Sequence, residues 1–282
     1  MKFKDKNIIV TGGSRGIGFA VAKAFYDEGA RVLAVARNEQ ELKGAQKILN
    51  NKEQFFILPA DVSSVSDRQK IKEFIENKLG GALHVLVNAA GIYGPIGFLE
   101  DNDTNAWEKT FAVNVFGTAE VSALVLPFMK KQKWGRIINF SGGGDGPLPR
   151  FTAYSASKGA IVRFTESLAA EVKDFNITVN AITPGPVNTK FLQDVLVAGK
   201  EKAGEEFYAS ARAQEKDGGV APEKSAEHIL YISGDESKFI SGKVISANRD
   251  NWVDFAAHAE EIKSGDIYNF RRIRPIDRGH EW

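Results

Sequence analysis

The sequence contains no cysteine, and this absence removes several kinds of chemistry at once. Without thiols there are no disulfides, no thiolate metal sites and no cysteine nucleophile. Only four histidines occur, and they are scattered without the spacing of a metal site, so we expect no metal. Any chemistry must therefore come from hydroxyl, amine or carboxylate groups, or from a cofactor.

Net charge and long apolar runs are also scarce. The formal net charge is +1, from 37 basic and 36 acidic residues, with no long block of like charge. This balance disfavours nucleic-acid and membrane partners. The N-terminus, "MKFKDKNIIV", has no apolar run long enough for a signal peptide, and we expect that no apolar segment reaches the length of a membrane span. We expect a cytoplasmic protein whose partners are small molecules and further copies of itself.

The composition is that of a globular protein with ample material for a core. Hydrophobic residues make up 43% of the 282 residues and charged residues 26%. This length allows one large domain or two small ones, but no shift in composition marks a boundary between halves. We therefore start from a single domain.

Short apolar runs alternate with longer stretches of helical period along the chain. Strands this short and apolar on both faces suit a parallel sheet that is covered by helices on both sides. The sequence therefore predicts an α/β fold, a single-domain doubly wound parallel sheet of about seven strands. The predicted strands are residues 7–10, 31–36, 54–58, 84–87, 135–140, 177–182 and 243–245, and the predicted helices are 16–28, 39–50, 65–79, 104–131, 153–174 and 222–233.

Two regions interrupt this alternation. Residues 183–219 begin with "TPGPVNT" and continue as a charged segment of mixed period, which suits a mobile substrate-selecting element over the carboxyl ends of the strands. Residues 247–282 form a tail with aromatic residues among charges of both signs, too apolar for plain disorder. We predict a dinucleotide-binding and catalytic domain at 1–246 and an extension at 247–282 that packs on it or on a neighbouring subunit.

The stretch "NIIVTGGSRGIGFAVAKAF" runs from a buried-strand pattern through a glycine loop into a helix. Glycines at such a position let the backbone approach a pyrophosphate, whose charge is met by the N–H groups at the start of the helix. The alternative is a plain glycine-containing turn. If the loop binds a dinucleotide, its contacts come from Gly12, Ser14, Arg15, Gly16, Ile17 and Gly18.

The choice between coenzymes depends on the end of the second strand, where an acid would hold the hydroxyls of the adenosine ribose. Ala36, Arg37 and Asn38 stand there instead. No acid repels a 2′-phosphate, and Arg37, helped by Arg15, can pair with one. NADP(H) is therefore favoured over NAD(H), with Asn38 as a further contact. The alternative is that both arginines are solvated surface groups.

Two further strand ends are candidates for coenzyme contacts. Asp61 and Val62 follow the strand "FFILPADV", and the Asp61 carboxylate can accept a hydrogen bond from the adenine amino group. Alternatively, Asp61 is a helix cap. The motif "NAAG" supplies small residues where a strand end passes close to the coenzyme, and its predicted contacts are Asn88, Ala89 and Gly91.

The stretch "TAYSASKGA" places Tyr154 and Lys158 four residues apart on one face of a predicted helix. Tyrosine normally titrates near pH 10, but an ammonium beside the phenol lowers its pKa and makes it a usable acid–base. Considered alone, this spacing is also common on inert helix surfaces. Ser141 follows the strand "RIINF" at the edge of the sheet where ligands bind, and Asn114 is a polar residue inside an apolar helix. A core asparagine with satisfied hydrogen bonds is the alternative for Asn114.

Together, "TGGSRGIG", "NAAG", Asn114, Ser141, "YSASK" and "PGPVNT" resemble, in this order, the short-chain dehydrogenase/reductase family, across residues 6 to about 245. The resemblance implies a Rossmann fold and a nicotinamide coenzyme. It implies that Tyr154 is the catalytic acid–base, that Lys158 binds the nicotinamide ribose and lowers the pKa of the tyrosine, and that Ser141 holds the substrate oxygen. Asn114 would support a proton-relay water. Contacts at the nicotinamide would come from Pro184, Gly185, Val187 and Thr189.

The sequence departs from the family pattern in two places. Many relatives end shortly after the last strand, whereas this chain continues for more than thirty residues. We predict a homodimer or homotetramer whose interface the extension remodels, with folding over a neighbour's active site as the alternative. The stretch "SGGGDGPLPRF" leaves room for a bulky or polar substrate. There Arg150, or the tail arginines Arg271, Arg272 and Arg274, can pair with an anionic group such as a phosphorylated sugar, unless these are a flexible loop and solvated side chains.

The favoured function is an NADP(H)-dependent oxidoreductase that transfers a hydride between the nicotinamide and a ketone or secondary alcohol, with Tyr154 as acid–base and with Ser141 and Arg150 on the substrate. Its nearest alternative is a 3-oxoacyl thioester reductase with the same catalytic set. Two other classes are a non-catalytic NADP(H)-binding regulator and a purely structural α/β subunit. The sequence leaves open the substrate, the direction of reaction, its stereochemistry and the oligomer number.

Overall fold

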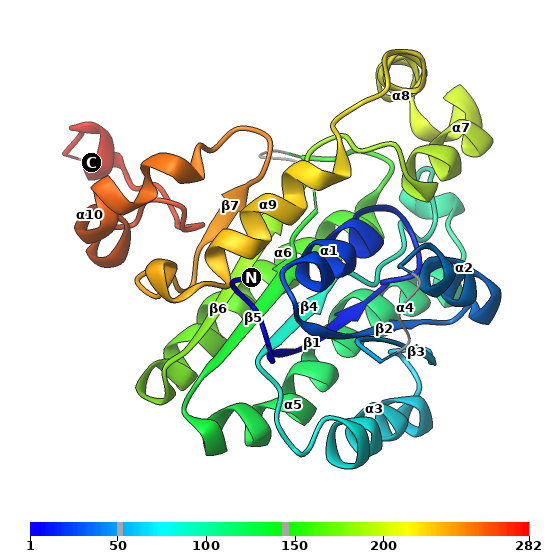
Figure 1. The fold of residues 1–282 in the computed structure, drawn as a ribbon. Coiled ribbons are helices and arrows are strands. Elements are labelled where there is room, and N and C mark those ends of the chain that lie inside the picture. Colours follow the sequence, from blue (N-terminus) through cyan, green and yellow to red (C-terminus); the bar gives the residue numbers. More distant parts are fainter. Residues whose placement is uncertain (50–52, 143–146, 282) are drawn as a thin grey trace.

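The structure, a computed structural model, describes residues 1–49, 53–142 and 147–281. Within these residues, seven parallel strands form one sheet in the order β3-β2-β1-β4-β5-β6-β7 (Figure 1). The α/β doubly wound fold predicted from the alternating pattern is confirmed. The strands are β1 Asn7–Thr11, β2 Arg31–Ala36, β3 Phe55–Pro59, β4 Val85–Asn88, β5 Gly135–Phe140, β6 Ile177–Thr183 and β7 Val244–Ser246.

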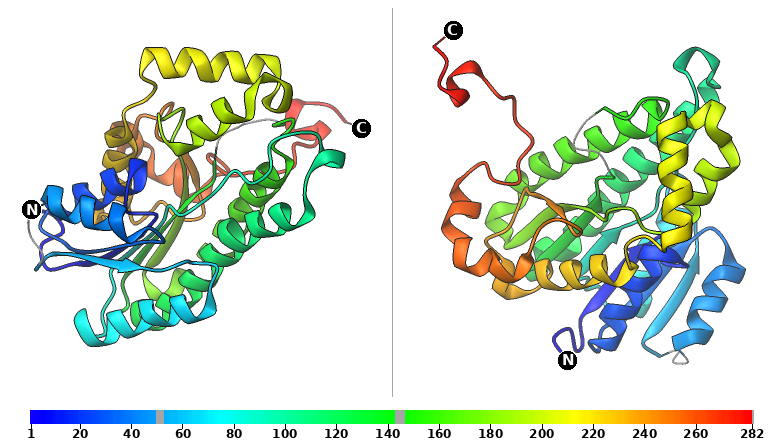
Figure 2. Two further views of the ribbon diagram at one scale, coloured as in Figure 1. Left: turned by 90° about the vertical axis from the view of Figure 1, so that its right-hand side faces the viewer. Right: turned by 90° about the horizontal axis from the view of Figure 1, so that it is seen from above.

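Helices cover both faces of this sheet (Figures 1 and 2). Side chains of α1, α2 and α9 pack on one face, and those of α3, α5 and α6 pack on the other. The α-helices are α1 Gly16–Asp27, α2 Glu39–Leu49, α3 Val65–Lys78, α4 Thr104–Phe111, α5 Thr118–Gln132, α6 Thr152–Val172, α7 Lys190–Ala203, α8 Glu205–Asp217, α9 Pro222–Ile232 and α10 Ala259–Ser264. The shorter turns are η1 Leu99–Asp101, η2 Ala112–Gly117, η3 Lys173–Phe175, η4 Asp235–Ser237, η5 Trp252–His258 and η6 Pro275–Arg278.

Alternation along each strand divides the apolar residues between two cores. In β1, Ile8 and Val10 point into the core beneath α1 and α9, while Ile9 points into the core on the opposite face. All three side chains are fully buried, since successive residues of a strand face opposite sides of the sheet. Helices on both faces explain why the strands are apolar throughout.

The predicted helix at 104–131 is interrupted. The chain forms α4, then the π-helical turn η2, and then α5. The continuous stretch Thr104–Gln132 is long and apolar enough to cross a membrane by length and composition, so the expectation that no segment has this character was wrong. Here the stretch forms a layer of the fold, because Val121, Val125 and Met129 are buried against the sheet.

The strand order places a crevice at the carboxyl ends of β1 and β4, the point where successive strands turn to opposite sides. Helices α7 and α8 lie over this edge of the sheet (Figure 1). Their apolar side chains form a third small core with Phe151 and Tyr154 of the α6 region. The predicted element over the strand ends is therefore a pair of helices.

The segment after β7 packs on the edge of the domain before it projects outward. Phe255 and Ile262 are buried in the core beside α9, and the carbonyl of Tyr268 accepts a hydrogen bond of 2.8 Å from the amide of Val244 in β7. The last described residues extend away from the body (Figure 2). In Figure 1, α10 and the C-terminus lie on the opposite side of the molecule from α7 and α8.

Candidate active site

A cavity of about 1060 Å³ lies at the carboxyl ends of the strands. Its walls come from the glycine loop, from the ends of β2, β4, β5 and β6, and from α7 and α8. One end is lined by backbone and polar groups, and the other by aromatic and aliphatic side chains. A single crevice thus joins two chemically different sites.

The glycine loop forms the floor of the polar end. Gly12 has a φ of +69°, and an added Cβ would lie 2.9 Å from the backbone of Ala89 and Ala90. A Cβ on Gly18 would lie 2.2 Å from the carbonyl oxygen of Gly12. Only glycine fits at these positions, and the N-terminus of α1 is thereby left open to the cavity. All six residues predicted for this loop line the cavity: Gly12, Ser14, Arg15, Gly16, Ile17 and Gly18.

The next part of the wall is the predicted adenosine end, where Ala36, Arg37, Asn38, Asp61 and Val62 line the cavity. The Asn38 side chain accepts hydrogen bonds from the backbone amides of Gln40 and Glu41, at 3.0 and 3.2 Å, and so caps α2. Glu41, which the sequence analysis did not select, also lines the cavity.

The Asp61 carboxylate already has protein partners. One oxygen accepts hydrogen bonds from the amide and hydroxyl of Ser63, and the other lies 3.5 Å from the ammonium of Lys109. Burial raises the pKa of Asp61, but these hydrogen bonds and the charges of Lys109 and Arg37 lower it overall. The group is therefore a carboxylate near neutral pH. Its hydrogen bond from the Ser63 amide stabilises the turn between β3 and α3.

The "NAAG" motif divides into lining and supporting residues. Ala89 and Gly91 line the cavity. Asn88 is buried and does not line the cavity, because its amide donates to Asn139 at 2.9 Å and to Ser122 at 3.1 Å. The Asn88 side chain therefore ties β4 to β5 and α5, and the predicted coenzyme contact of Asn88 stays a prediction.

Tyr154 and Lys158 lie side by side on α6 and both line the cavity. The Lys158 ammonium donates a hydrogen bond of 2.7 Å to the carbonyl of Phe140 and lies 5.7 Å from the centre of the Tyr154 ring. Gly142 covers the phenol closely, since a Cβ there would lie 2.6 Å from the Tyr154 hydroxyl oxygen. The pair thus stands at the end of β5, between the two ends of the cavity.

Burial shifts both groups toward their neutral forms. It lowers the pKa of Lys158 to about 8 and, together with Tyr93, raises the pKa of Tyr154 well above its usual range. The lowered tyrosine pKa that the sequence predicted is not present in this structure. Its physical reason is that the ammonium bonds to a carbonyl oxygen and that the phenol is enclosed by aromatic rings, with the Tyr93 ring centre 4.7 Å away.

Ser141 is buried directly after β5 but does not line the cavity, although Phe140 and Gly142 on either side do. Its hydroxyl lies 2.9 Å from that of Thr183 and 3.4 Å from the carbonyl oxygen of Ile182. The predicted contact with a substrate oxygen therefore requires rotation of this side chain away from Thr183.

Asn114 lies in the π-helical turn η2 and is fully buried. Its amide exchanges two hydrogen bonds of 2.9 Å with the backbone of Ile92 and donates a third, of 3.0 Å, to the hydroxyl of Ser157. It does not line the cavity. The Asn114 side chain therefore ties the chain after β4 to α6, and its predicted place in the catalytic set stays a prediction.

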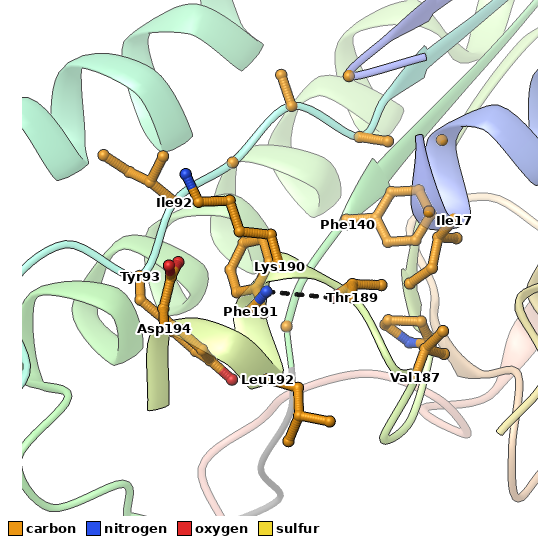
Figure 3. A pocket seen from close by; sticks show the side chains of 18 of the residues that line it. Ile17, Ile92, Tyr93, Phe140, Val187, Thr189, Lys190, Phe191, Leu192 and Asp194 are labelled. Atoms are coloured by element: carbon orange, nitrogen blue, oxygen red, sulfur yellow. Dashed lines mark hydrogen bonds between the residues drawn. The ribbon is translucent and has the colours of Figure 1, made fainter. Parts of the chain in front are cut away.

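The loop after β6 closes the polar end, and its predicted residues Pro184, Gly185, Val187 and Thr189 all line the cavity. The Thr189 hydroxyl accepts a hydrogen bond of 3.3 Å from the amide of Phe191 and so caps α7 (Figure 3). A Cβ on Gly16 would lie 3.2 Å from the methyl group of Thr189. The start of α7 therefore packs directly on the glycine loop.

The opposite end of the cavity is apolar and aromatic. Ring centres of Phe151 and Phe191 lie 5.2 and 4.5 Å from that of Tyr93. Figure 3 shows Tyr93, Phe191, Leu192 and Asp194 on one side of the cavity and Ile17, Phe140 and Val187 on the other. Leu148, Val195 and Phe207 complete the apolar wall.

Two polar groups stand in this apolar wall. Within the described residues, neither the Tyr93 hydroxyl nor the Asp194 carboxylate makes a hydrogen bond or an ion pair closer than 4 Å. Burial raises the pKa of Asp194 despite the opposing charges of Lys190 and Arg15, and burial with the charge of Asp194 raises the pKa of Tyr93 to about 12. These groups are available to a ligand.

None of the arginines predicted to bind an anionic substrate lines the cavity. Arg150 does not line the cavity, because its guanidinium donates 2.5 Å to the carbonyl of Glu201 and stacks 4.0 Å over the ring of Phe98. In the tail, Arg271 pairs with Asp266 and Asp277, and Arg274 pairs with Asp277. Arg272 does not line the cavity either. Within the predicted glycine-rich stretch at 141–151, residues 143–146 lie outside the described residues.

The described ranges 1–49, 53–142 and 147–281 hold no group of three or more acidic or histidine side chains placed to bind a metal ion. The residues that the sequence analysis missed have weak local signals. Glu41 occurs as an ordinary acid in the first turn of a helix, and Tyr93 follows the "NAAG" motif by one residue. Phe191, Asp194 and Phe207 lie within the predicted substrate element, but their spacing does not show which side chains face the cavity.

Known proteins resemble this chain in both sequence and fold. A sequence model described as short chain dehydrogenase matches residues 6–198. The chain is 33% identical to dehydrogenase/reductase SDR family member 4 of Caenorhabditis elegans, over 86% of this chain and 94% of that protein. It is 34% identical to a 3-oxoacyl acyl-carrier-protein reductase of Thermotoga maritima, over 87% and 97%. A crystal structure of NAD+-bound xylitol dehydrogenase superposes with a TM-score of 0.78 at 27% identity, covering 87% of this chain and 98% of that one.

Proposed function

The chain belongs to the short-chain dehydrogenase/reductase family and is an oxidoreductase of that type, and from this premise we propose that it interconverts an apolar ketone and the corresponding secondary alcohol with NADP(H). The observation that carries the proposal is the position of Tyr154 and Lys158. They lie at the junction between a polar end fitted for a dinucleotide and an aromatic end fitted for an apolar substrate.

The polar end fits a nicotinamide coenzyme. Gly12 and Gly18 leave the space that side chains would fill, and the open N-terminus of α1 supplies N–H groups for a pyrophosphate. Arg37 and Asp61 would hold the adenosine, and Lys158 and Thr189 would hold the nicotinamide ribose and ring. When bound, the coenzyme supplies or accepts a hydride at the substrate carbon.

The protein's own part in the reaction is to move a proton at the substrate oxygen. In reduction, the Tyr154 hydroxyl gives its proton to the oxygen as the carbonyl carbon receives the hydride, so an alcohol forms and a phenolate remains. The Lys158 ammonium stabilises that phenolate, and Ser141, rotated from Thr183, donates to the same oxygen. The raised pKa of Tyr154 keeps the phenol protonated near neutral pH, the form that reduction requires.

The lining of the substrate end supports a neutral, mainly apolar substrate. Tyr93, Phe191 and Phe207 offer ring faces to a cyclic or aliphatic group. The unpaired carboxylate of Asp194 repels an anionic substrate and accepts a hydrogen bond from a hydroxyl or amine. These features disfavour the phosphorylated-sugar substrate that the sequence suggested.

A 3-oxoacyl thioester reductase is the second candidate. It is supported by the 34% identity to the Thermotoga maritima enzyme and by an apolar end that also suits an acyl chain. The intact Tyr154 and Lys158 argue against a non-catalytic regulator. A cytoplasmic location is part of the proposal, supported by the soluble type of fold.

The test is NADPH consumption by the full chain against a panel of carbonyl compounds, with NADH run in parallel. The panel holds aliphatic and cyclic ketones, steroids, acyl thioesters and keto-sugar nucleotides. We expect turnover of neutral apolar ketones, and Tyr154→Phe is expected to lower kcat by about 10²- to 10⁴-fold because it removes the proton donor. Coenzyme affinity should stay within about threefold, since the phenyl ring keeps its packing.

In the same assay, Asp194→Asn tests the substrate class. Removing the carboxylate should raise kcat/KM for anionic thioesters relative to neutral ketones, whereas Asp217→Asn, at the exposed end of α8, should change neither. A wild-type preference for keto-sugar nucleotides would refute the apolar substrate. Full activity of Tyr154→Phe would refute the mechanism.

A further inference from the structure

Glu41 lines the polar end of the cavity together with Arg37 and Asn38, where the proposed function, on which this inference rests, puts the adenosine ribose. One carboxylate oxygen lies 2.7 Å from the guanidinium of Arg15, and the other accepts a hydrogen bond of 3.0 Å from the hydroxyl of Ser14. The Asn38 cap fixes the backbone amide of Glu41 at the start of α2. Glu41 is therefore held against the glycine loop by contacts on both sides.

This placement changes the charge that a coenzyme meets. Arg15 was predicted to bind the 2′-phosphate of NADP(H), but the structure pairs it with Glu41. Arg37 lines the same end and makes no hydrogen bond or ion pair within the described residues. One arginine is thus available to a 2′-phosphate, and the other is neutralised by a carboxylate in the same wall.

The two coenzymes differ at the 2′ position in ways that Glu41 distinguishes. A phosphate monoester carries nearly two negative charges near pH 7, so it is repelled by the carboxylate and must compete with it for Arg15. The 2′-hydroxyl of NAD(H) can instead donate a hydrogen bond to the carboxylate. Glu41 therefore opposes the preference that Arg37 creates.

We propose that Glu41 determines coenzyme specificity: it weakens NADP(H) binding, supports NAD(H) binding, and makes the wild-type protein accept both. In the Glu41→Gln variant, the amide retains the shape of the side chain but frees Arg15 for the phosphate. The direction of the effect follows from the loss of one negative charge beside the 2′ position.

The experiment measures dissociation constants of NADP+ and NAD+ by isothermal titration calorimetry on the full chain, without substrate. We expect Glu41→Gln to bind NADP+ about five- to tenfold more tightly and NAD+ no more tightly than wild type, with a smaller gain at high salt. Arg37→Ala should weaken NADP+ alone. The matched control is Glu39→Gln in the same helical turn, since Glu39 pairs with Lys43 at 2.7 Å and does not line the cavity. It should leave both constants unchanged.

An unchanged ratio of the two constants in Glu41→Gln would overturn the inference. An equal loss of affinity for both coenzymes would also overturn it, because that result shows that Glu41 only holds the loop in shape. Binding is measured without turnover, so an inactive protein that still shows the predicted shift refutes the proposed catalysis and leaves this inference standing. Failure of both coenzymes to bind wild type would refute the two together.

Discussion

Tyr154 and Lys158 are both buried, and burial disfavours the charged form of each side chain. Burial raises the pKa of the phenol and lowers that of the ammonium, and the hydrogen bond to Phe140 positions the lysine without adding a counter-charge. Near neutral pH, Tyr154 is therefore a protonated phenol that can donate its proton. Lys158, one helical turn away, changes from charged to neutral as the pH passes about 8. In the proposed mechanism, Lys158 is therefore the group expected to limit activity as pH rises.

We predict that kcat/KM for carbonyl reduction falls as pH rises through about 8, the pKa of Lys158. A lysine is charged below its pKa, so the ammonium that stabilises the developing phenolate is present below pH 8 and is lost above it. Tyr154 stays protonated over this range because its pKa is raised. Steady-state rates between pH 6 and 10, at saturating NADPH, measure the profile.

Lys158→Arg serves as the control for this profile, because a guanidinium keeps its charge over the whole range. Its residual activity should show no loss near pH 8. If the variant keeps the same falling limb, the limb belongs to another group and the assignment to Lys158 is wrong.

At the level of elements, the π-helical turn η2 is the junction that positions the site. It carries Asn114 inward, and the side chain joins the chain after β4 to α6 through Ile92 and Ser157. The Ser157 hydroxyl in turn donates 2.7 Å to the carbonyl of Tyr154. A single amide therefore links η2, the chain after β4 and α6, the helix that carries Tyr154 and Lys158.

We expect Asn114→Ala to lower the free energy of unfolding by about 2–4 kcal/mol, because it removes this partner from the half-buried amide and carbonyl of Ile92 and from the buried Ser157 hydroxyl. Urea denaturation followed by circular dichroism measures the loss. Asn105→Ala, at an exposed position of α4, should cost less than about 0.5 kcal/mol. Equal losses in the two variants would contradict the role of Asn114 as a buried link.

Helices α7 and α8 form the other element with a direct effect on function. They add Leu192, Val195 and Ala211 to a small core that includes Tyr154 itself. The position of Tyr154 is therefore coupled through packing to α7 and α8. This packing supports the proposal that an apolar substrate binds at that end.

At the scale of the whole molecule, the extension has two parts of different character. Phe255 and Ile262 are buried in the domain core, whereas Ile273 and Ile276 are 58% and 67% exposed. The arm beyond Phe270 reaches away from the body (Figure 2). Exposed apolar side chains on a projecting arm suit contact with a second copy of the chain, as predicted for a homodimer or homotetramer.

We predict that deleting residues 271–282 reduces the oligomer mass measured by light scattering, because the deletion removes apolar surface that a neighbouring subunit covers. The buried part of the extension stays, so the melting temperature at a fixed subunit concentration reports whether the domain is intact. An unchanged oligomer mass with an intact domain would defeat the interface role of the arm.

Local order along the chain was enough to predict the alternating strands and helices, the glycine loop, the spacing of Tyr154 and Lys158, and the location of the element over the strand ends. Their signals lie within a few residues of one another, and backbone geometry converts them directly into structure. The seven strands and most of the predicted cavity-lining residues followed from such signals.

The direction in which individual side chains turn depends instead on contacts between distant parts of the fold. Arg15 meets Glu41 across 26 residues of chain, Asn88 reaches Asn139, and Arg150 reaches Glu201. The apolar wall around Tyr93 and Asp194 likewise joins segments about a hundred residues apart. Such contacts depend on the packing of distant elements, where burial and competing partners choose the rotamer, and local spacing contains no information about those partners.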